Sequence, residues 1–256
     1  GGARASVRVR GASARASFQV TRGRRRTGRH TTTGKDLSLG SSRARGRRRE
    51  VRMYSSLFGT AALIDVGIQV VGWALSCALS TEKYYDMCGS LTFIAIAIAS
   101  LLSGTLSAKH VVLCAIVLLW ALRLGSFLVV RVHKTGGDQR FDKVKGRPGA
   151  YAVYWLLQGL WVYVTLLPFL FAMSSSAAGG FGVVDSIGLS LFALGFLTES
   201  IADLQKFKFK MDGQGGFISS GLWRYSRHPN YFGEMIVWLG VYLVCLPSLS
   251  GAEHLA

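Results

Sequence analysis

The segment from Glu199 to Glu234 holds the residues best suited to chemistry. Glu199, Asp203, Lys206 and Lys210 follow one another at spacings of four, three and four residues. Residues at these spacings share one face if the segment is helical. Two interpretations are open: a solvated stripe of salt bridges, or a charged wall for a ligand that bears phosphate, which Lys and Arg bind well.

A second polar cluster, WRYSRHPNY, runs from Trp223 to Tyr231. Pro229 suits the first position of a helix, because its missing N–H and fixed φ cost nothing there. His228 would then be the cap residue. The start of a helix offers free N–H groups and a positive dipole end, which attract anions. Arg224 and Arg227 precede it and strengthen that field.

The aromatic residues of the same stretch are Trp223, Tyr225 and Tyr231. Aromatic side chains at this place serve as anchors at the membrane surface. They are equally able to stack on a nicotinamide or an adenine ring. Composition favours anchoring at the membrane surface over stacking on a ligand, and both roles stay open.

Other catalytic and metal-binding motifs are missing from the sequence. The five His residues show no HxxxH or HExxH spacing, and the four Cys residues form no CxxC pair, so a metal site is not expected. No GxGxxG follows a strand-like segment and no Walker sequence occurs. A dinucleotide would therefore bind without a Rossmann domain.

Apolar segments long enough to cross a membrane must position these residues. Stretches 87–108, 148–184 and 235–252 contain no charged residue, which excludes an ordinary soluble enzyme. A spanning helix needs about 20 apolar residues. The sequence therefore predicts an all-α fold, a polytopic membrane helix bundle with about six transmembrane helices. The predicted spans are residues 54–79, 88–107, 110–132, 150–173, 181–199 and 231–249.

Three polar residues fall inside the predicted spans: Asp65 and Gln69 in the first, and Arg123 in the third. An ionised group in the hydrocarbon is costly, so each is expected to face other helices or a wet cavity. They either pair with one another or contact a substrate.

Lys and Arg predict the orientation of the bundle, because cytosolic loops carry an excess of both. The loops at 80–87, 133–149 and 200–230, with Arg131 at a span end, carry twelve Lys and Arg residues, and the opposite side, counted after Met53, carries only Lys109. These three loops are therefore predicted to be cytosolic.

Residues 1–52 differ from the rest of the chain. They hold 15 Arg and one Lys against Asp36 and Glu50, and almost nothing that a core could bury. This basic, low-complexity leader is interpreted as disordered, as a transit peptide, or as translated sequence that is not native and precedes Met53. No nucleic-acid function is assigned to it. The multi-span domain is expected over residues 53–256.

The sequence between Gly221 and Glu234 resembles the C-terminal signature of the steroid 5-alpha-reductase-like membrane family, which includes the sterol reductases. The matching residues are Gly221-Leu222-Trp223 and SRHPNYFGE from Ser226 to Glu234. Residues 199–210, Trp120 to Leu124 and Asp138 to Phe141 also resemble that family. The RHPxYxG part is shared with isoprenylcysteine and related lipid methyltransferases, which use S-adenosylmethionine.

The resemblance implies that NADPH is held by this region. Lys206 and Lys210 match the family's basic positions, Phe217 and Trp223 match the apolar residue and Trp before the motif, and Asn230 is the motif's Asn. Arg227, His228, Tyr231 and Glu234 match further motif positions. Family members continue past Gly251 into another apolar segment and a polar tail, so the chain is expected to be truncated at its C-terminus.

The resemblance implies an NADPH-dependent oxidoreductase that reduces a carbon–carbon double bond of a lipophilic, steroid- or enone-like substrate. The alternatives are an S-adenosylmethionine-dependent lipid or prenyl methyltransferase and a non-catalytic membrane scaffold. The catalytic acid is not assigned, the candidates being Asp65, Tyr84, Tyr85, Tyr151 and Tyr154. The expected location is the endoplasmic reticulum membrane, or a plastid or other organelle membrane if residues 1–52 are a transit peptide.

Overall fold

The computed structural model describes residues 34–103, 107–135, 137–175, 180–213 and 215–249. The chain divides into two units, residues 1–41 and 42–256. Of the first unit only residues 34–41 are described, as the beginning of a helix. Residues 1–33 of the predicted leader and residues 250–256, where truncation is expected, lie outside the described part.

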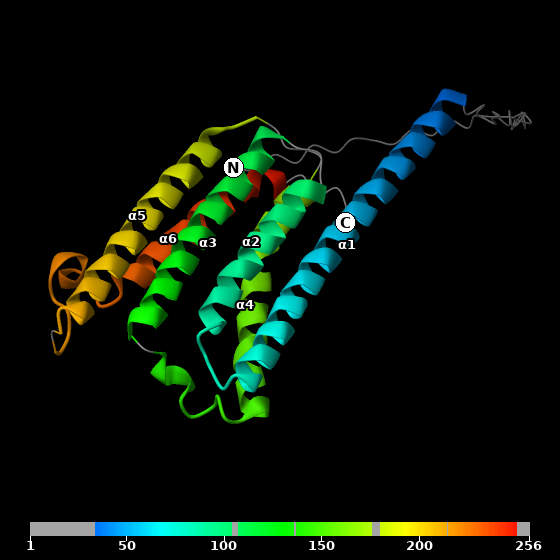
Figure 1. Ribbon diagram of the computed structural model, residues 1–256. Helices are drawn as coiled ribbons and strands as arrows, with labels where there is room; N and C mark the ends of the chain where they lie inside the picture. Colours follow the sequence, from blue (N-terminus) through cyan, green and yellow to red (C-terminus); the bar gives the residue numbers. More distant parts are fainter. Residues whose placement is uncertain (1–33, 104–106, 136, 176–179, 214, 250–256) are drawn as a thin grey trace, which may run out of the picture. The chain divides into compact units, whose positions relative to one another are not determined.

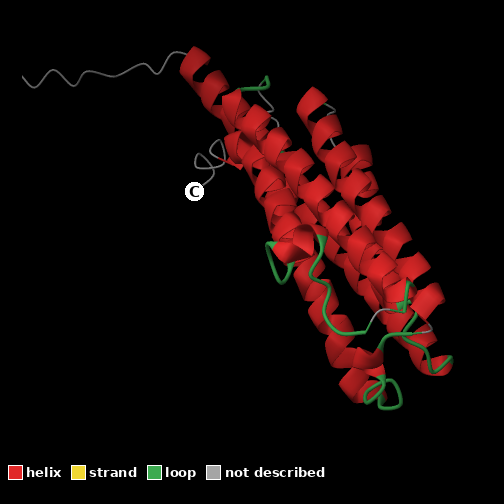
Figure 2. Cartoon of the chain, turned by 90° about the vertical axis from the view of Figure 1, so that its left-hand side faces the viewer, coloured by secondary structure: helices red, strands yellow, loops and turns green. Residues whose placement is uncertain are grey.

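Six long helices make up the described chain, and no strand occurs among the described residues (Figures 1 and 2). Each contains a segment long and apolar enough to span a membrane, so the predicted all-α membrane fold is confirmed. The helices are α1 (Gly34–Ala78), α2 (Tyr85–Ser103), α3 (Ala108–Thr135), α4 (Pro148–Ser174), α5 (Val183–Met211) and α6 (Pro229–Leu249). Two short 3-10 turns, η1 (Gln139–Phe141) and η2 (Gly221–Arg224), lie in the connections.

Two helices extend beyond the spans predicted from the sequence. The spanning part of α1 is Ser55–Ala78, but the helix already begins at Gly34. Adding residues to an existing helix costs little, and Arg is a good helix former. The fifth helix continues to Met211, which places Glu199, Asp203, Lys206 and Lys210 on one helix as the spacing predicted.

Four glycines hold α5 and α6 in close contact. A Cβ atom on Gly195 would lie 2.5 Å from the backbone nitrogen of Val237, and one on Gly240 would lie 2.5 Å from that of Phe192. Gly188 and Gly233 face similarly short distances to the opposite backbone. Only a residue without a side chain permits this approach. The start of α6 is therefore fixed against the middle of α5.

The polar residues inside the spans find protein partners. Gln69 Nε2 donates to Asp65 Oδ1 at 3.2 Å, so these two pair with each other. Arg123 pairs instead with Glu199 and Asp203 of α5. Lys109, the Lys that the topology count placed on the side opposite the basic loops, is buried and forms an ion pair with Asp185. Its Nζ lies 2.9 Å from Asp185 Oδ1. It is therefore not a free loop charge.

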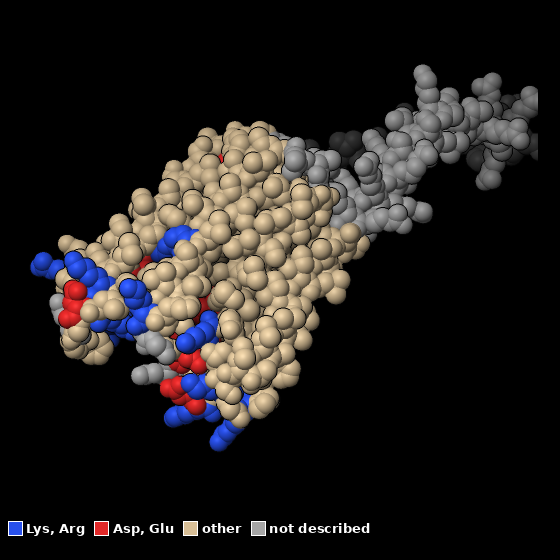
Figure 3. All heavy atoms as spheres, viewed as in Figure 1, with Lys and Arg blue, Asp and Glu red and all other residues tan. Residues whose placement is uncertain are grey.

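The three basic loops lie at one end of the unit formed by residues 42–256, called here the basic end (Figure 1). Lys and Arg side chains gather there, while most of the surface above that end is formed by other residues on the face that Figure 3 shows. This clustering agrees with the predicted asymmetry. The cytosolic orientation of this end stays a prediction.

Candidate functional site

The start of α6 lies at the basic end, with Pro229 as its first residue. The backbone N–H of Phe232 donates to the carbonyl oxygen of His228 at 3.1 Å. This is the first hydrogen bond of the helix, so the predicted cap position of His228 is confirmed. The His228 ring stacks on Tyr231, with ring centres 5.3 Å apart.

Trp223 ties the segment before α6 to the side of α5. Its indole N–H donates to the carbonyl oxygen of Ala202 at 3.0 Å, and the side chain is buried. The Leu222 N–H donates to Gln205 Oε1 at 3.0 Å. The ammonium group of Lys206 lies 4.8 Å from the centre of the Trp223 ring, a cation–π contact. The basic residues of α5 and the motif are thus brought together.

A buried charged cluster joins α3 to α5. Arg123 donates to Glu199 Oε1 at 2.8 Å, to Asp203 Oδ2 at 3.0 Å and to Ser200 Oγ at 2.9 Å. Trp120 Nε1 donates to the other oxygen of Glu199 at 3.0 Å. Glu199 and Asp203 are only 3% and 8% exposed, so Arg123 supplies the cation that two buried carboxylates need.

Asn230 extends this cluster to α6. Its Nδ2 donates to Asp203 Oδ1 at 3.3 Å. Its Oδ1 is buried and has no hydrogen-bond partner among the described residues. Gly233 brings α6 so close that a Cβ atom there would lie 2.5 Å from the Glu199 nitrogen. Asn230 therefore has one buried acceptor that no described residue satisfies.

A second charged network lies between α2, α3 and the connection before α4. Arg131 Nη2 lies 2.8 Å from Asp86 Oδ2, and Arg140 Nη2 lies 3.6 Å from Asp86 Oδ1. The Nε and Nη2 atoms of Arg140 both donate to Asp138. The neighbouring Phe141 is buried and packs on Tyr85, with ring centres 4.7 Å apart. The packing of Phe141 fixes the backbone next to Arg140.

The Asp138–Arg140 pair stays ionised near neutral pH. Burial raises the pKa of the Asp138 carboxyl, but hydrogen bonds from the Arg140 side chain and backbone outweigh burial, so that pKa lies below its ordinary value. The hydrogen bond to Asp138 in turn raises the pKa of the Arg140 guanidinium.

Three adjoining hollows run inward from the basic end. The outer compartment encloses about 790 Å³ and shares Lys206 and Lys210 with the middle compartment, which encloses about 240 Å³. The middle compartment shares five residues with an inner compartment of about 350 Å³. The shared residues are Asp86, Leu124, Leu128, Arg140 and Glu234. The inner compartment has an aromatic floor of Phe93, Trp120 and Trp161.

All nine residues implied by the resemblance line these compartments. The outer compartment is lined by Lys206, Lys210, Phe217, Trp223, Arg227 and His228. The middle compartment is lined by Asn230, Tyr231 and Glu234 together with the two lysines. Their roles in binding stay predictions.

Sequence reasoning missed most of the inner compartment. Asp86, Ser90 and Gln158 line it and were not singled out. Arg140 was noted only within a family-like stretch, without a role. An acidic residue in the first turn of α2 was the available signal for Asp86. Of the five candidate acids, Tyr85 alone lines this compartment, and its hydroxyl donates to the carbonyl oxygen of Tyr154 at 3.0 Å.

The compartments differ in charge. Lys206, Lys210 and Arg227 line the outer compartment, and no Asp or Glu does. The middle compartment balances four cations with four carboxylates. The cations are Arg131, Arg140, Lys206 and Lys210, and the carboxylates are Asp86, Glu199, Asp203 and Glu234. An anionic group is therefore best accommodated in the outer compartment.

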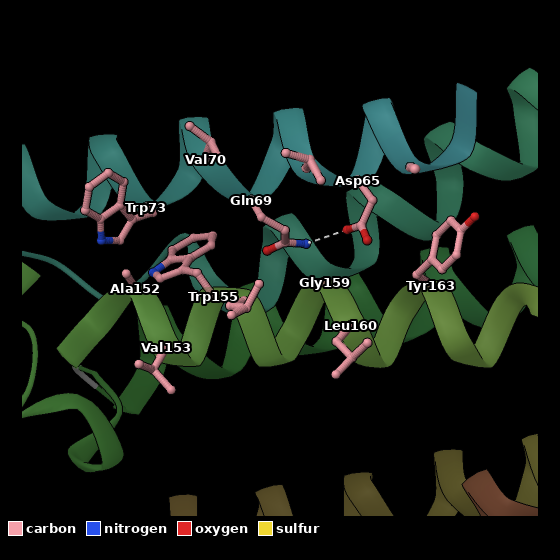
Figure 4. A pocket seen from close by; sticks show the side chains of 13 residues that line it. Asp65, Gln69, Val70, Trp73, Ala152, Val153, Trp155, Gly159, Leu160 and Tyr163 are labelled. Carbon is pink, nitrogen blue, oxygen red and sulfur yellow. Dashed lines mark hydrogen bonds between the residues drawn. The ribbon is translucent and has the colours of Figure 1, made fainter. Parts of the chain in front are cut away.

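A separate apolar groove of about 620 Å³ lies between α1 and α4. Asp65 and Gln69 extend from α1 toward Gly159 of α4 and are its main polar residues (Figure 4). Leu156 and Leu160, both more than half exposed, line the side of α4. Gln158 lines the inner compartment instead, so the groove and that compartment use different faces of α4.

Comparison with known proteins gives a family match and a distant relative. A family model described as "Protein of unknown function (DUF1295)" matches residues 72–256. An uncharacterized protein of Schizosaccharomyces pombe, C594.04c, is 33% identical over 108 residues, covering 34% of this chain and 31% of the relative. The chain therefore matches about a third of that curated relative's length. No solved structure matches the chain.

Proposed function

The chain belongs to the DUF1295 family of unknown function, and we propose that it is an NADPH-dependent membrane oxidoreductase that reduces a carbon–carbon double bond of a lipophilic substrate. The observation that carries the proposal is the outer compartment. It combines three cations, no carboxylate and the aromatic side chains of Phe209, Phe217 and Trp223, and it adjoins the middle compartment, which in turn adjoins an inner one lined by aromatic residues.

The charge of the outer compartment suits NADPH better than S-adenosylmethionine. NADPH carries a diphosphate and a 2′-phosphate, and Lys and Arg bind phosphate by charge-assisted hydrogen bonds. S-adenosylmethionine carries a positive sulfonium and no phosphate. Three cations without a carboxylate would repel the sulfonium. This favours the reductase over the methyltransferase, although both families share RHPxYxG.

The described residues allow a division of roles in binding. Lys210 and Arg227 are exposed and would bind phosphate, while Lys206 is positioned by Trp223. Phe217 is 99% exposed, so its ring is free to stack on a base. One face of Trp223 is occupied by Lys206, which makes Trp223 a positioning residue. The unpartnered Oδ1 of Asn230 can accept a hydrogen bond from a ribose hydroxyl.

The inner compartment supplies the groups for proton transfer. When bound, NADPH supplies a hydride and is left as NADP⁺, while the second carbon of the double bond takes a proton. Tyr85 is the candidate acid that lines this compartment, and we assign it the proton. Its hydroxyl would then donate its hydrogen bond to the substrate instead of to the Tyr154 carbonyl oxygen.

The surroundings agree with a lipophilic substrate. The walls of the inner compartment include Leu124, Leu128 and Leu157, and six spans hold the compartment within a membrane. The apolar groove between α1 and α4 offers a second surface for lipid. The Lys and Arg asymmetry supports placing the basic end in the cytosol. The endoplasmic reticulum membrane is proposed from the family resemblance alone.

Ligand titration tests the proposal. The 256-residue chain in lipid nanodiscs is titrated with NADPH, NADH and S-adenosylmethionine, with protein fluorescence as the readout. Saturable binding that is tightest for NADPH supports the reductase. Saturation by S-adenosylmethionine alone would establish the methyltransferase, and binding of none of the three would favour a scaffold.

A further inference from the structure

We propose that Glu234 and Arg140 together bind the carboxamide of the nicotinamide ring, at the junction of the middle and inner compartments. The carboxamide N–H groups would donate to Glu234 and its carbonyl oxygen would accept from Arg140. This inference rests on the proposed function. It adds which end of the cofactor enters the inner compartment and which residues recognise it.

The junction is defined by the residues that line both compartments. Two of the five are leucines, and the polar three are Asp86, Arg140 and Glu234. Asp86 is already engaged by Arg131 at 2.8 Å. Glu234 makes no hydrogen bond or ion pair with any described residue. It is the unengaged carboxylate at this point.

Arg140 offers the complementary donor. Asp138 takes its Nε and Nη2 atoms, while Nη1 has no partner among the described residues. Glu234 and Arg140 form no ion pair with each other, although both line the junction. One side of the junction is therefore an acceptor and the other a donor. A primary carboxamide presents both kinds of group, at opposite ends of one planar unit.

Both residues are held in place by their neighbours. Phe141 inserts among Tyr85, Tyr151 and Tyr154 and so fixes the backbone next to Arg140. On the other side, the tight contact of Gly233 with α5 fixes the backbone next to Glu234. These fixed backbones limit where the two side chains can reach, which favours recognition of a small planar group between them.

The aromatic floor supports the same orientation. Phe93 and Trp161 lie with ring centres 5.4 Å apart, and both line the inner compartment. Aromatic side chains offer faces and edges on which a flat ring can pack. Gln158 Oε1, buried and without a described partner, adds another acceptor deeper inside. Glu234 and Gln158 Oε1 are hydrogen-bond acceptors without a described partner. The N–H groups of a carboxamide can donate to them, whereas a carboxylate has no hydrogen to donate.

Two dinucleotides test the inference by binding alone. NADP⁺ and nicotinic acid adenine dinucleotide phosphate differ only in a carboxamide against a carboxylate. The parent should prefer NADP⁺ by about ten- to a hundredfold, the size of one charge-assisted hydrogen bond. Glu234→Gln should reduce or invert this preference, because Arg140 would then attract the carboxylate. Arg140→Gln should increase it, because Glu234 would repel the carboxylate unopposed.

Matched controls separate recognition from a general effect. Lys143→Gln removes one positive charge from the same connection, but Lys143 is exposed and lines no compartment, so it should keep the parent's preference. Glu234→Asp keeps the charge and should retain a preference for NADP⁺ even if Glu234→Gln folds poorly. Thermal melting checks the folding of each variant.

The outcomes distinguish this inference from the proposed function. Opposite shifts for Glu234→Gln and Arg140→Gln support carboxamide recognition. If the parent binds both dinucleotides equally and neither variant changes the ratio, the inference is overturned while the proposed function stands. If the parent binds neither dinucleotide, both fall.

Discussion

Replacing Arg123 by Met should destabilise the bundle strongly. The guanidinium is the cation shared by Glu199 and Asp203, at 2.8 Å and 3.0 Å. Met keeps much of the side-chain length and removes the charge. Two carboxylates that are 3% and 8% exposed would then lack a cation.

The cost follows from the neighbours that stay. Removing one partner of a buried ion pair costs about 3–5 kcal/mol. Trp120 still donates to Glu199 and Asn230 still donates to Asp203, which favours the lower value. A loss of about 3 kcal/mol corresponds to a fall in melting temperature of roughly 6–12 °C for a chain of this size.

Thermal melting in nanodiscs measures this effect. The matched control is Arg224→Met, because Arg224 is exposed and lines none of the three compartments. A triple variant that adds Glu199→Gln and Asp203→Asn should regain most of the lost stability, since no buried charge is left unpaired. An Arg123→Met protein that melts like the parent, or a triple variant no better than the single one, would refute the reasoning.

Four further predictions concern binding, packing, pH and topology. Lys210→Ala should weaken NADPH binding about ten- to a hundredfold, and more at low salt, as titration would show. Gly233→Ala should cost about 1–3 kcal/mol by overpacking against α5, measured by melting. Asp138→Asn should be less stable than the parent at pH 7. That difference should begin to shrink in melts as the pH falls below about 4 and should be lost as the pH falls through the native pKa of Asp138, which lies below its ordinary value. In sealed microsomes, a cysteine at Gly213 should react with an impermeant thiol reagent, and one at Ser175 should not.

Each of these predictions has a contrary result. Lys208 is exposed and lines none of the compartments, so Lys208→Ala should bind NADPH nearly like the parent, and an equal loss would argue against a specific role for Lys210. Gly146 has open space around it, so Gly146→Ala controls for the loss of a glycine. A stability difference for Asp138→Asn that does not begin to shrink as the pH falls below about 4 would contradict the ion-pair account. Equal labelling of both cysteines would contradict the topology.

The helices could be predicted because membrane spans obey a local rule. About twenty predominantly apolar residues identify a span whatever its neighbours are, and all six spans were predicted in this way, including those that carry a charged residue. The cap at His228 and the extension of α5 were also local, since they depend on Pro229 and on spacing within one segment. The clustering of basic loops at one end follows from six alternating spans.

The partners across helices could not be predicted from local patterns. Arg123 was expected to face other helices, but its pairing with α5 depends on which helices are neighbours. The inner compartment combines Asp86, Gln158 and Glu234 from three helices, and each is unremarkable in its own segment. The glycines of α5 and α6 acquire their meaning only when the two backbones meet. A single sequence does not encode these contacts in any local signal.

The affinity of the parent chain for NADPH, measured by calorimetry at two salt concentrations, tests the central claim most directly. The account predicts saturable binding at one site per chain that weakens as salt rises, because Lys206, Lys210 and Arg227 meet phosphates in the outer compartment. Folded protein in nanodiscs that shows no heat of NADPH binding at low salt would contradict it.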